Sequence, residues 1–421
     1  MEEVIYNKNT YKVENGILNL SGKGIKKITD IKGLERLETV EKLILSHNEI
    51  AKITGLENLT SLKHLYLDND TIPYSNSSQG LITKIEGLDT LVELQLLDLS
   101  YNRITKIEGL EKLTNLQELA LFSNSIPNIE NLENTINLIK LDLGGNKITK
   151  IKGLAHQKKL QYLSISNSEI SKIENLEQLE NLFSLNLAYN NLKEIREEDM
   201  KHLQVLPKLR ELNILGNGIT EIKNLHFFQN IQSLSLRMNK IREIHDFDEM
   251  PNLKSLSLEA TELTEIKGLN QLKNLQKLFL GQNNIEKIQR LDELVKLRQL
   301  SLWGNKIKKI SGLDSLSNLE KLILSHNQIH EITGLENLVK LQELNLAHNK
   351  ITEIKGLNNL VKLQSLNLEH NNITEVKGLD ILVNLEELNL IANLVKNKSG
   401  LEKLTRLKNK NFCLIDNPRK E

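Results

Sequence analysis

The chain repeats itself every 22 residues, and this period constrains the fold more than any other feature. The segment LQLLDLSYNRITKIEGL (94–110) returns as LQELNLAHNKITEIKGL (341–357) and as LQSLNLEHNNITEVKGL (363–379). The polar residue of the motif L-x-L-x-x-N-x-I is used here as the anchor of each repeat. It occurs eighteen times, and thirteen of the seventeen intervals are 22 residues long. Fourteen anchors are Asn, and the exceptions are Lys23, Asp70, Ser168 and Thr261. A period of this length predicts a solenoid in which each repeat is one coil.

Within one repeat the spacing of the apolar residues changes from three to two. After the anchor Asn48, apolar residues three apart fit a tight helical or 3₁₀ path, whereas Leu65 and Leu67 have the period of a strand. Each inward side chain contributes about 1.5–3 kcal/mol when it is fully buried. Fixing the backbone costs about 1–2 kcal/mol per residue. One coil alone is therefore unstable, and stacking of coils is what stabilises the fold.

These patterns predict an α/β fold, a right-handed solenoid of about 18 coils. A parallel sheet is expected on the concave side, and 3₁₀ or short helical segments on the convex side. Residues 1–15 are expected to form an N-terminal cap, residues 16–403 the solenoid, and residues 404–421 a degenerate last coil and C-terminal cap. Two insertions, around residues 73–80 and 195–207, interrupt the period. They are either partner contacts or tolerated surface insertions, and the second is expected to contain a short helix that ends near Pro207.

Polar and small residues at fixed positions predict how the coils are joined. The amide of an anchor Asn both donates and accepts, so it can bond turn backbones in its own coil and in the adjacent one, forming a ladder. Seven residues after the anchor, the thirteen regular coils carry Gly eight times and Asn three times. Both residues tolerate a positive φ, which predicts a left-handed turn at this position.

Aromatic side chains gather at positions that the core does not require. The residues six, four, two and one before each anchor are expected to point out of the concave face. These positions make up about a sixth of the chain but hold seven of its fifteen aromatics. Solvent-facing aromatics on a rigid sheet are typical of a protein-binding surface. The alternative is that strands tolerate aromatics because of their β-propensity.

The same face has a mild surplus of acids, nine against five bases at the three strand positions, which favours a basic partner surface. Two binding regions are expected, Tyr66–Tyr189 and Phe279–Trp303, separated by a stretch rich in Ser and Asn. The candidate partner-binding residues are Tyr66, Asp98, Tyr101, Phe122, Asp142, Tyr162, Tyr189, Glu259, Phe279 and Trp303.

Composition excludes several other classes of protein. The chain has 55 basic and 55 acidic residues, so nothing in its charge favours nucleic acid or a membrane surface as a partner. The single Cys413 excludes a disulfide framework, and no apolar run approaches the length of a membrane span. The polar N-terminus lacks the pattern of a signal peptide. The expected location is the cytoplasm, with the nucleus as the alternative.

Four histidines directly precede an anchor: His47, His326, His348 and His370. The last three lie one coil apart, so their imidazoles could share a metal ion or respond to pH. The alternative is that His is simply tolerated in this turn, and the sequence favours it because no carboxylate cluster of set geometry accompanies the histidines. No metal, cofactor or catalytic residue is therefore predicted, and the chain is not expected to be an enzyme.

The 22-residue period with I-x-x-I-x-G-L after the anchor resembles the leucine-rich repeat of the phosphatase-regulator type, which the bacterial internalins also use. LDLSYNRITKIEGL (97–110) and KLFLGQNNIEKIQRLDELVKL (277–297) are similar to the eukaryotic regulatory subunit of protein phosphatase 1. The resemblance covers residues 16–417. It implies a leucine-rich-repeat solenoid that binds another protein.

In the phosphatase-regulator family, acidic and aromatic residues in the middle of successive concave strands grip the phosphatase. The resemblance implies this role for Asp98, Asp142 and Phe279, which match the required types. The leading hypothesis is a non-catalytic scaffold that binds a protein, such as a phosphatase, on its concave face. One alternative is an internalin-like adhesion or recognition protein. Another is a solenoid that binds a small molecule or glycan in a pocket lined by Arg237, Glu259 and Trp303.

Overall fold

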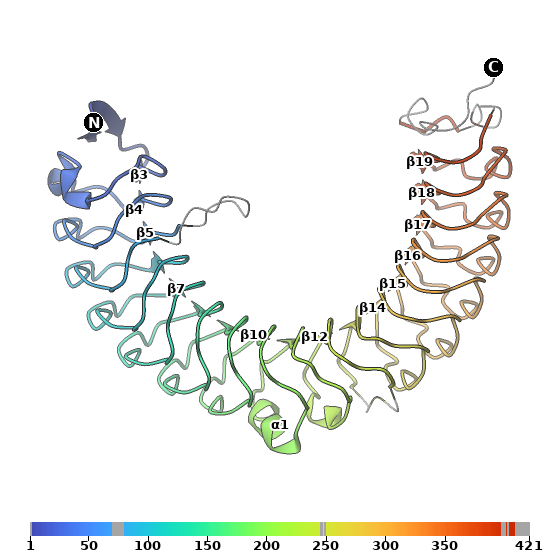
Figure 1. The fold of residues 1–421 in the computed structure, drawn as a ribbon, viewed down its shortest axis with the longest axis horizontal. Coiled ribbons are helices and arrows are strands. Elements are labelled where there is room, and N and C mark those ends of the chain that lie inside the picture. The colour runs from blue at the N-terminus through green and yellow to red at the C-terminus, as the bar shows by residue number, and fades with distance from the viewer. Residues whose placement is uncertain are drawn as a thin grey trace. The chain divides into compact units, whose positions relative to one another are not determined.

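The computed structural model consists of two compact units of stacked coils (Figure 1). Unit 1 comprises Met1–Leu192 and Glu197–Ile214, and unit 2 comprises Lys193–Arg196 and Leu215–Glu421. The structure describes residues 2–69, 80–244, 247, 250–396, 401 and 404–408.

Each coil of unit 1 contributes one three-residue strand to a parallel sheet. Neighbouring strands pair in register, so that the middle leucine of one strand lies beside the middle leucine of the next. The strands are β3 (Ile17–Asn19), β4 (Lys42–Ile44), β5 (His64–Tyr66), β6 (Leu96–Asp98), β7 (Glu118–Ala120), β8 (Lys140–Asp142), β9 (Tyr162–Ser164), β10 (Ser184–Asn186) and β11 (Glu211–Asn213).

Unit 2 repeats this arrangement. Its strands are β12 (Ser233–Ser235), β13 (Ser255–Ser257), β14 (Lys277–Phe279), β15 (Gln299–Ser301), β16 (Lys321–Ile323), β17 (Glu343–Asn345), β18 (Ser365–Asn367) and β19 (Glu387–Asn389). Each described anchor from residue 23 to residue 393 thus follows a strand, which confirms the predicted solenoid with its parallel sheet. The eighteenth anchor, Asn417, lies outside the described residues.

Helical segments are few and short among the residues that the structure describes. They are the 3₁₀ segments η1 (Ile28–Asp30), η2 (Leu34–Arg36) and η3 (Leu225–Phe227) and the α-helix α1 (Glu197–Gln204). The helix predicted in the second insertion is confirmed as α1, whose acidic first turn suits the positive end of the helix dipole. Within the described ranges, no helix has the length and apolar character that crossing a membrane requires.

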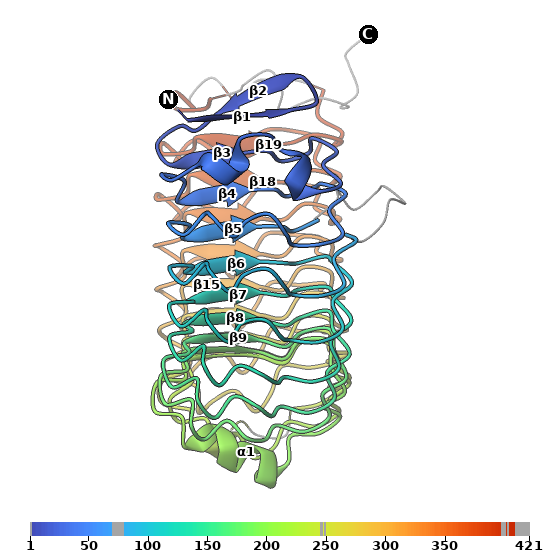
Figure 2. The same cartoon turned by 90° about the vertical axis from the view of Figure 1, so that its left-hand side faces the viewer.

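An antiparallel hairpin precedes the first coil of unit 1 (Figure 2). Its strands are β1 (Glu3–Tyr6) and β2 (Asn9–Lys12), joined by Asn7 and Lys8, which both have positive φ. Paired backbone hydrogen bonds between Ile5 and Lys32 attach the hairpin to the first coil. The roles of residues 1–15 as an N-terminal cap and of residues 404–421 as a last coil and C-terminal cap stay predictions. Cys413 lies outside the described residues.

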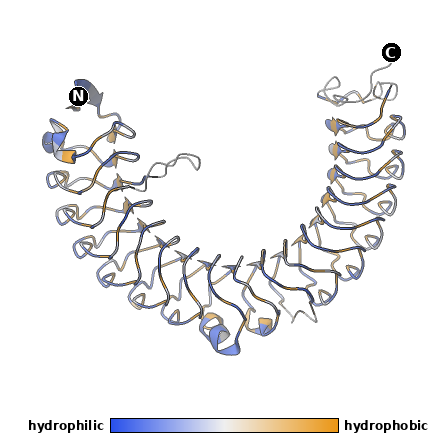
Figure 3. Ribbon diagram, in the orientation of Figure 1, coloured by the Kyte–Doolittle hydropathy of each residue, from blue (hydrophilic) through white to orange (hydrophobic). Residues whose placement is uncertain are grey.

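The core of each unit consists mainly of the leucines and isoleucines of the repeat, with Phe228, Phe247 and Met250 among its other members in unit 2. Figure 3 shows how hydrophobic and hydrophilic residues alternate along the coils. In one coil of unit 1, Ile53, Leu62 and Leu65 are completely buried. The return leg of this coil turns through bonds between residues three apart, such as the one from the Leu62 N–H to the Leu59 carbonyl (3.0 Å). The spacing of three therefore encodes the tight path that was predicted.

The anchor asparagines form the predicted ladder. Asn305 Nδ2 donates to the carbonyls of Leu280 in the preceding coil (2.9 Å) and Leu302 in its own coil (3.0 Å). Its Oδ1 accepts from the Ile285 N–H (3.0 Å). Where Thr261 replaces Asn, its hydroxyl still donates to the Leu258 carbonyl (2.7 Å). Asp70, another exception, lies outside the described residues.

The backbone passes through the left-handed region twice in a regular coil. The predicted position, seven residues after the anchor, is confirmed; at Gly109 φ is 68° and a Cβ atom would lie 2.5 Å from the Ile85 carbonyl oxygen. The second position, directly before the anchor, was not predicted. It has φ of 58° at Tyr101, 53° at Tyr189 and 54° at His348. This second turn sets the direction of side chains beside the strand face.

Candidate protein-binding face

All ten candidate residues lie on the strand side of their unit, outside the leucine core. Tyr162 and Tyr189 are 44% and 47% exposed, and the other eight are half-buried. The residues of unit 1 are Tyr66, Asp98, Tyr101, Phe122, Asp142, Tyr162 and Tyr189, and those of unit 2 are Glu259, Phe279 and Trp303. The packing of the core therefore does not account for the aromatic rings.

Five of the unit 1 candidates line one hollow of about 530 Å³ on the strand face, which we call the acidic hollow. These are Tyr66, Asp98, Tyr101, Phe122 and Asp142. Other charged residues also line it, namely Asp68, Glu118 and Lys140. The 22-residue period brings these side chains together because positions separated by one or two coils in sequence become neighbours across the sheet.

The rings in the acidic hollow are held by contacts across coils. The centroids of Tyr101 and Phe122 are 5.3 Å apart, with the ring planes tilted by 59°. Phe122 also lies over Gly144 in the following coil, where a Cβ atom would be only 2.9 Å from Phe122 Cδ2. On the other side, Lys42 Nζ lies 4.8 Å from the centroid of the Tyr66 ring. The absence of a side chain at Gly144 thus decides where Phe122 can rest.

The carboxylates of the hollow are fixed by short local hydrogen bonds. Asp98 Oδ1 accepts from the Ser100 N–H (2.9 Å), and Asp142 Oδ1 accepts from the Gly144 N–H (3.0 Å). Burial raises the pKa of the Asp98 carboxyl above its ordinary value; the hydrogen bonds from Ser100 oppose this rise, and the charges of Asp68 and Asp142 add to it. An unpaired carboxylate that is partly desolvated attracts a cation.

Two unit 1 candidates do not line the acidic hollow. The ring of Tyr162 lies beside that of Phe183, with centroids 6.1 Å apart, and Phe183 is 37% exposed. Phe183 was missed by the sequence reasoning because it lies seven residues before its anchor, one position outside those assigned to the face. Tyr189 occupies the left-handed position before Asn190.

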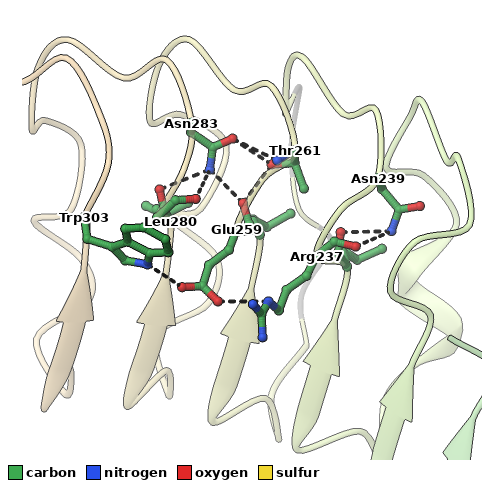
Figure 4. Close-up of polar contacts among 10 residues, drawn as sticks. Arg237, Asn239, Glu259, Thr261, Leu280, Asn283 and Trp303 are labelled. Carbon is green, nitrogen blue, oxygen red and sulfur yellow. Dashed lines mark hydrogen bonds and ion pairs between the residues drawn. The ribbon is translucent and has the colours of Figure 1, made fainter. Parts of the chain in front are cut away.

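In unit 2 two of the three candidate residues, Glu259 and Trp303, are linked by a polar contact, which Arg237 extends (Figure 4). Trp303 Nε1 donates to Glu259 Oε1 (3.0 Å), and Arg237 Nε lies 3.0 Å from Glu259 Oε2. The Glu259 side chain is 13% exposed and the Arg237 side chain is 43% exposed, so this ion pair is buried on the side of the carboxylate and open to solvent on the side of the guanidinium. We call these three residues the Trp303 bridge. It spans four strands, from β12 to β15.

A glycine makes the Trp303 bridge feasible. Trp303 and Glu259 are two coils apart, and the equivalent position in the coil between them is Gly281. A Cβ atom on Gly281 would lie 2.2 Å from Trp303 Nε1 and 2.3 Å from its Cδ1. The indole therefore lies across Gly281. One alternative drawn from the sequence grouped Arg237, Glu259 and Trp303 as the lining of a pocket for a small molecule or glycan, and the structure brings these three side chains into contact. Gly281 was missed, although a glycine one coil away from a tryptophan at the same repeat position is a signal that could have indicated the contact.

Phe279 lies next to the Trp303 bridge. Its strand neighbours are Ser257 and Ser301, which are paired with it in register on either side. The half-buried ring thus lies between two small polar side chains. Its strand neighbours carry neither a second ring nor a charge, unlike the residues of the acidic hollow.

The stacked coils place this protein in the class of repeat solenoids. A family model described as leucine-rich repeat region matches residues 17–286, and a model of leucine-rich repeats in two copies matches residues 273–315, 295–337, 317–360 and 339–381. The chain belongs to the leucine-rich-repeat family.

Several solved structures share the fold. A leucine-rich-repeat protein of Leptospira interrogans is 26% identical, with a TM-score of 0.73 over 91% of this chain and 98% of that one. The functional domain of InlJ from Listeria monocytogenes is 21% identical, with a TM-score of 0.57 over 86% of this chain and 74% of that one. A chain from the Toll–Spatzle complex of Drosophila is 20% identical, with a TM-score of 0.65 over 87% of this chain and 53% of that one. No curated protein gives a significant match.

Proposed function

We propose that this chain is a non-catalytic scaffold that binds another protein on the strand faces of its solenoid, in the cytoplasm or nucleus. The observation that carries the proposal is the placement of Trp303. Its indole is excluded from the core, lies across Gly281 and is hydrogen bonded to Glu259. A ring already held in place loses little conformational entropy when a partner covers it, and tryptophan is enriched among residues that dominate binding energy.

The acidic hollow supports the proposal through a different chemistry. Its rings offer apolar area, and Asp98 and Asp142 offer negative charge beside it. A basic segment of a partner protein would neutralise these carboxylates while its apolar stem contacts the rings. The partner surface that suits unit 1 is therefore basic, in agreement with the surplus of acids in the sequence. Neither nucleic acid nor a membrane is proposed as a partner.

The finer form of the proposal is that the partner is a protein phosphatase. Asp98, Asp142 and Phe279 have the residue types that grip the enzyme in the phosphatase-regulator family, and each is the last residue of its strand, four residues before the anchor. A second candidate is surface recognition of the internalin kind, which the fold similarity to the InlJ domain favours.

Affinity capture from lysate tests the proposal, with equal amounts of wild type or of one variant immobilised on each column. Wild type is compared with Trp303→Ala and Phe122→Ala, and Val339→Ala, a 46% exposed valine outside the face positions, is the control. Loss of a central aromatic typically weakens binding by about 2 kcal/mol, roughly 30-fold. The main partner should be lost from the Trp303→Ala or Phe122→Ala column and retained by the control, with little change in melting temperature.

If every variant retains the same partners, the strand faces do not form the binding site. Purified protein phosphatase 1 catalytic subunit tests the finer form directly: binding that Asp98→Ala and Phe279→Ala both weaken would support it. If the catalytic subunit does not bind, the finer form is wrong. The scaffold would then have another partner, and the internalin-like candidate would be favoured.

A further inference from the structure

Three histidines in unit 2 form a column directly before their anchors. Because the period is 22 residues and the backbone is left-handed at each of them, the imidazoles of His326, His348 and His370 come into register. The ring centroids are 4.1 Å apart for the first pair and 4.3 Å for the second, and the planes are inclined by only 11° and 16°. The left-handed turn does not require histidine, since Tyr101 and Ala260 occupy it elsewhere.

A carboxylate accompanies the C-terminal end of this column. Glu369 directly precedes His370, and its Oε1 lies 3.7 Å from His370 Nε2. Its other oxygen, Oε2, accepts a hydrogen bond from Asn389 Nδ2 (3.1 Å), which orients the carboxylate from the next coil. One potential ligand atom each from His348, Glu369 and His370 lies within 4.8 Å of the others. The sequence alone indicated no carboxylate beside these histidines, and the structure places Glu369 there.

We propose that His348, Glu369 and His370 bind a divalent transition-metal ion of the Zn²⁺ type. Imidazole nitrogen and carboxylate oxygen suit Zn²⁺, Ni²⁺ and Cu²⁺, whereas Mg²⁺ and Ca²⁺ prefer oxygen ligands alone. Two histidines and one glutamate supply three ligands and leave a coordination position for water or for a group from a partner. The orientation of Glu369 by Asn389 is the kind of outer contact that metal-binding carboxylates use.

The ion requires a modest rearrangement of one side chain. Bonds of about 2.0–2.2 Å place the ligand atoms of a tetrahedral site about 3.3 Å apart, so the cluster must contract. The lone pairs of two parallel imidazoles also point in parallel directions within their ring planes, so one ring must turn. The His370 side chain is 50% exposed and has room to do so. Once bound, the ion links the coils of Asn349 and Asn371, which stabilises the folded state by mass action.

Titration of untagged protein with ZnCl₂ by isothermal calorimetry tests the site. One ion per chain should bind at pH 7.5, raise the melting temperature, and persist in excess Mg²⁺. His348→Asn and Glu369→Gln should each weaken binding at least tenfold. His47→Asn is the matched control, because His47 occupies the same left-handed position without a neighbouring histidine in the column (φ 58°). Asparagine tolerates this backbone conformation, so the variants retain the fold.

The outcomes separate this site from other arrangements. Undetectable Zn²⁺ binding, or equal affinity in wild type and in both variants, would overturn the proposal. Loss in His326→Asn and His348→Asn with full retention in Glu369→Gln would also overturn it, because the ion would then be held by the stacked rings alone. Binding should weaken as the pH is lowered, because protons compete with a metal ion for imidazole nitrogen and carboxylate oxygen.

Discussion

The acidic hollow of unit 1 and the Trp303 bridge of unit 2 are built on the same repeat but differ in chemistry. In the hollow, Tyr101 and Phe122 contact each other, and the carboxylate of Asp98 lies near other acids. In the bridge, the carboxylate of Glu259 is engaged on both sides, by the indole of Trp303 and the guanidinium of Arg237. In the hollow Lys140 lies 3.9 Å from Glu118 and compensates only part of the negative charge, whereas the carboxylate of the bridge is paired with a guanidinium.

The two regions have the same framework and differ in the residues of the strand face. Both regions share the leucine core and the asparagine ladder, which together determine where the strands lie. The rings of both regions rest over a glycine in an adjacent coil, Gly144 for Phe122 and Gly281 for Trp303. Surface chemistry is therefore set by the face residues together with the glycines that leave room for them.

The largest effect is expected when the shared ladder is broken in either region. Asn102 and Asn283 each donate from Nδ2 to a carbonyl of the preceding coil and to one of their own coil. Replacement of either by Ala leaves several buried backbone groups without a partner, at about 1–3 kcal/mol for each such group. Both variants should lose about 3 kcal/mol or more in urea-induced unfolding.

Asn318→Ala is the control for this prediction, because Asn318 donates to the Val295 carbonyl at an exposed site, where water can replace the bond. It should change the free energy of unfolding by less than about 1 kcal/mol. A markedly unequal loss in Asn102→Ala and Asn283→Ala would contradict the view that the two regions share one framework.

Gly281→Ala should lower stability less than the loss of a ladder asparagine, but it should displace the side chain of Trp303 on the strand face. The new methyl group would occupy the position of the indole, so Trp303 must move away from Glu259. Trp303 is the single tryptophan of the chain, and its fluorescence should shift to the red and become more accessible to acrylamide. The stability loss should be about 1–2 kcal/mol, typical of overpacking.

Gly144→Ala is the matched variant in the other region, because its methyl group would meet Phe122 instead. It should leave the tryptophan spectrum unchanged. An unchanged spectrum in Gly281→Ala as well would show that the indole does not lie across this glycine.

The sequence predicted the framework well because the framework is periodic. The anchors gave the position of each strand from β3 to β19, and Gly and Asn seven residues later gave one of the two left-handed turns. The other turn, directly before the anchor, was missed because it holds residues as different as Tyr101, Met238 and His348. Here tertiary structure imposes the backbone conformation, and the residue type does not report it.

The contacts on the face were harder to predict. Membership of the face follows from repeat position, so Phe122 and Trp303 were found. The direction in which a ring leans does not follow from position, since Phe122 lies toward the following coil and Trp303 toward the preceding one. The ion pair of Arg237 with Glu259 likewise depends on side-chain rotamers across coils, which a period does not specify.

The smallest effect is expected from Asp98→Asn. Because the folded state raises the pKa of Asp98, the native state disfavours its ionised form. The contribution of this group to stability is largest below the ordinary pKa of about 3.9 and is lost as pH rises through the raised, folded-state value. Asn cannot ionise and keeps an oxygen that can accept from the Ser100 N–H. The variant should therefore melt slightly higher than wild type at pH 7 and at nearly the same temperature at pH 4.

The corresponding substitution in the Trp303 bridge should have the opposite sign. Glu259→Gln removes the charge that pairs with Arg237, so the melting temperature at pH 7 should fall. If both variants were stabilised, the distinction between an uncompensated and a compensated carboxylate would be wrong. If only Asp98→Asn is stabilised and it also weakens binding of a basic partner, the acidic hollow retains a charge that lowers the stability of the fold because binding requires it.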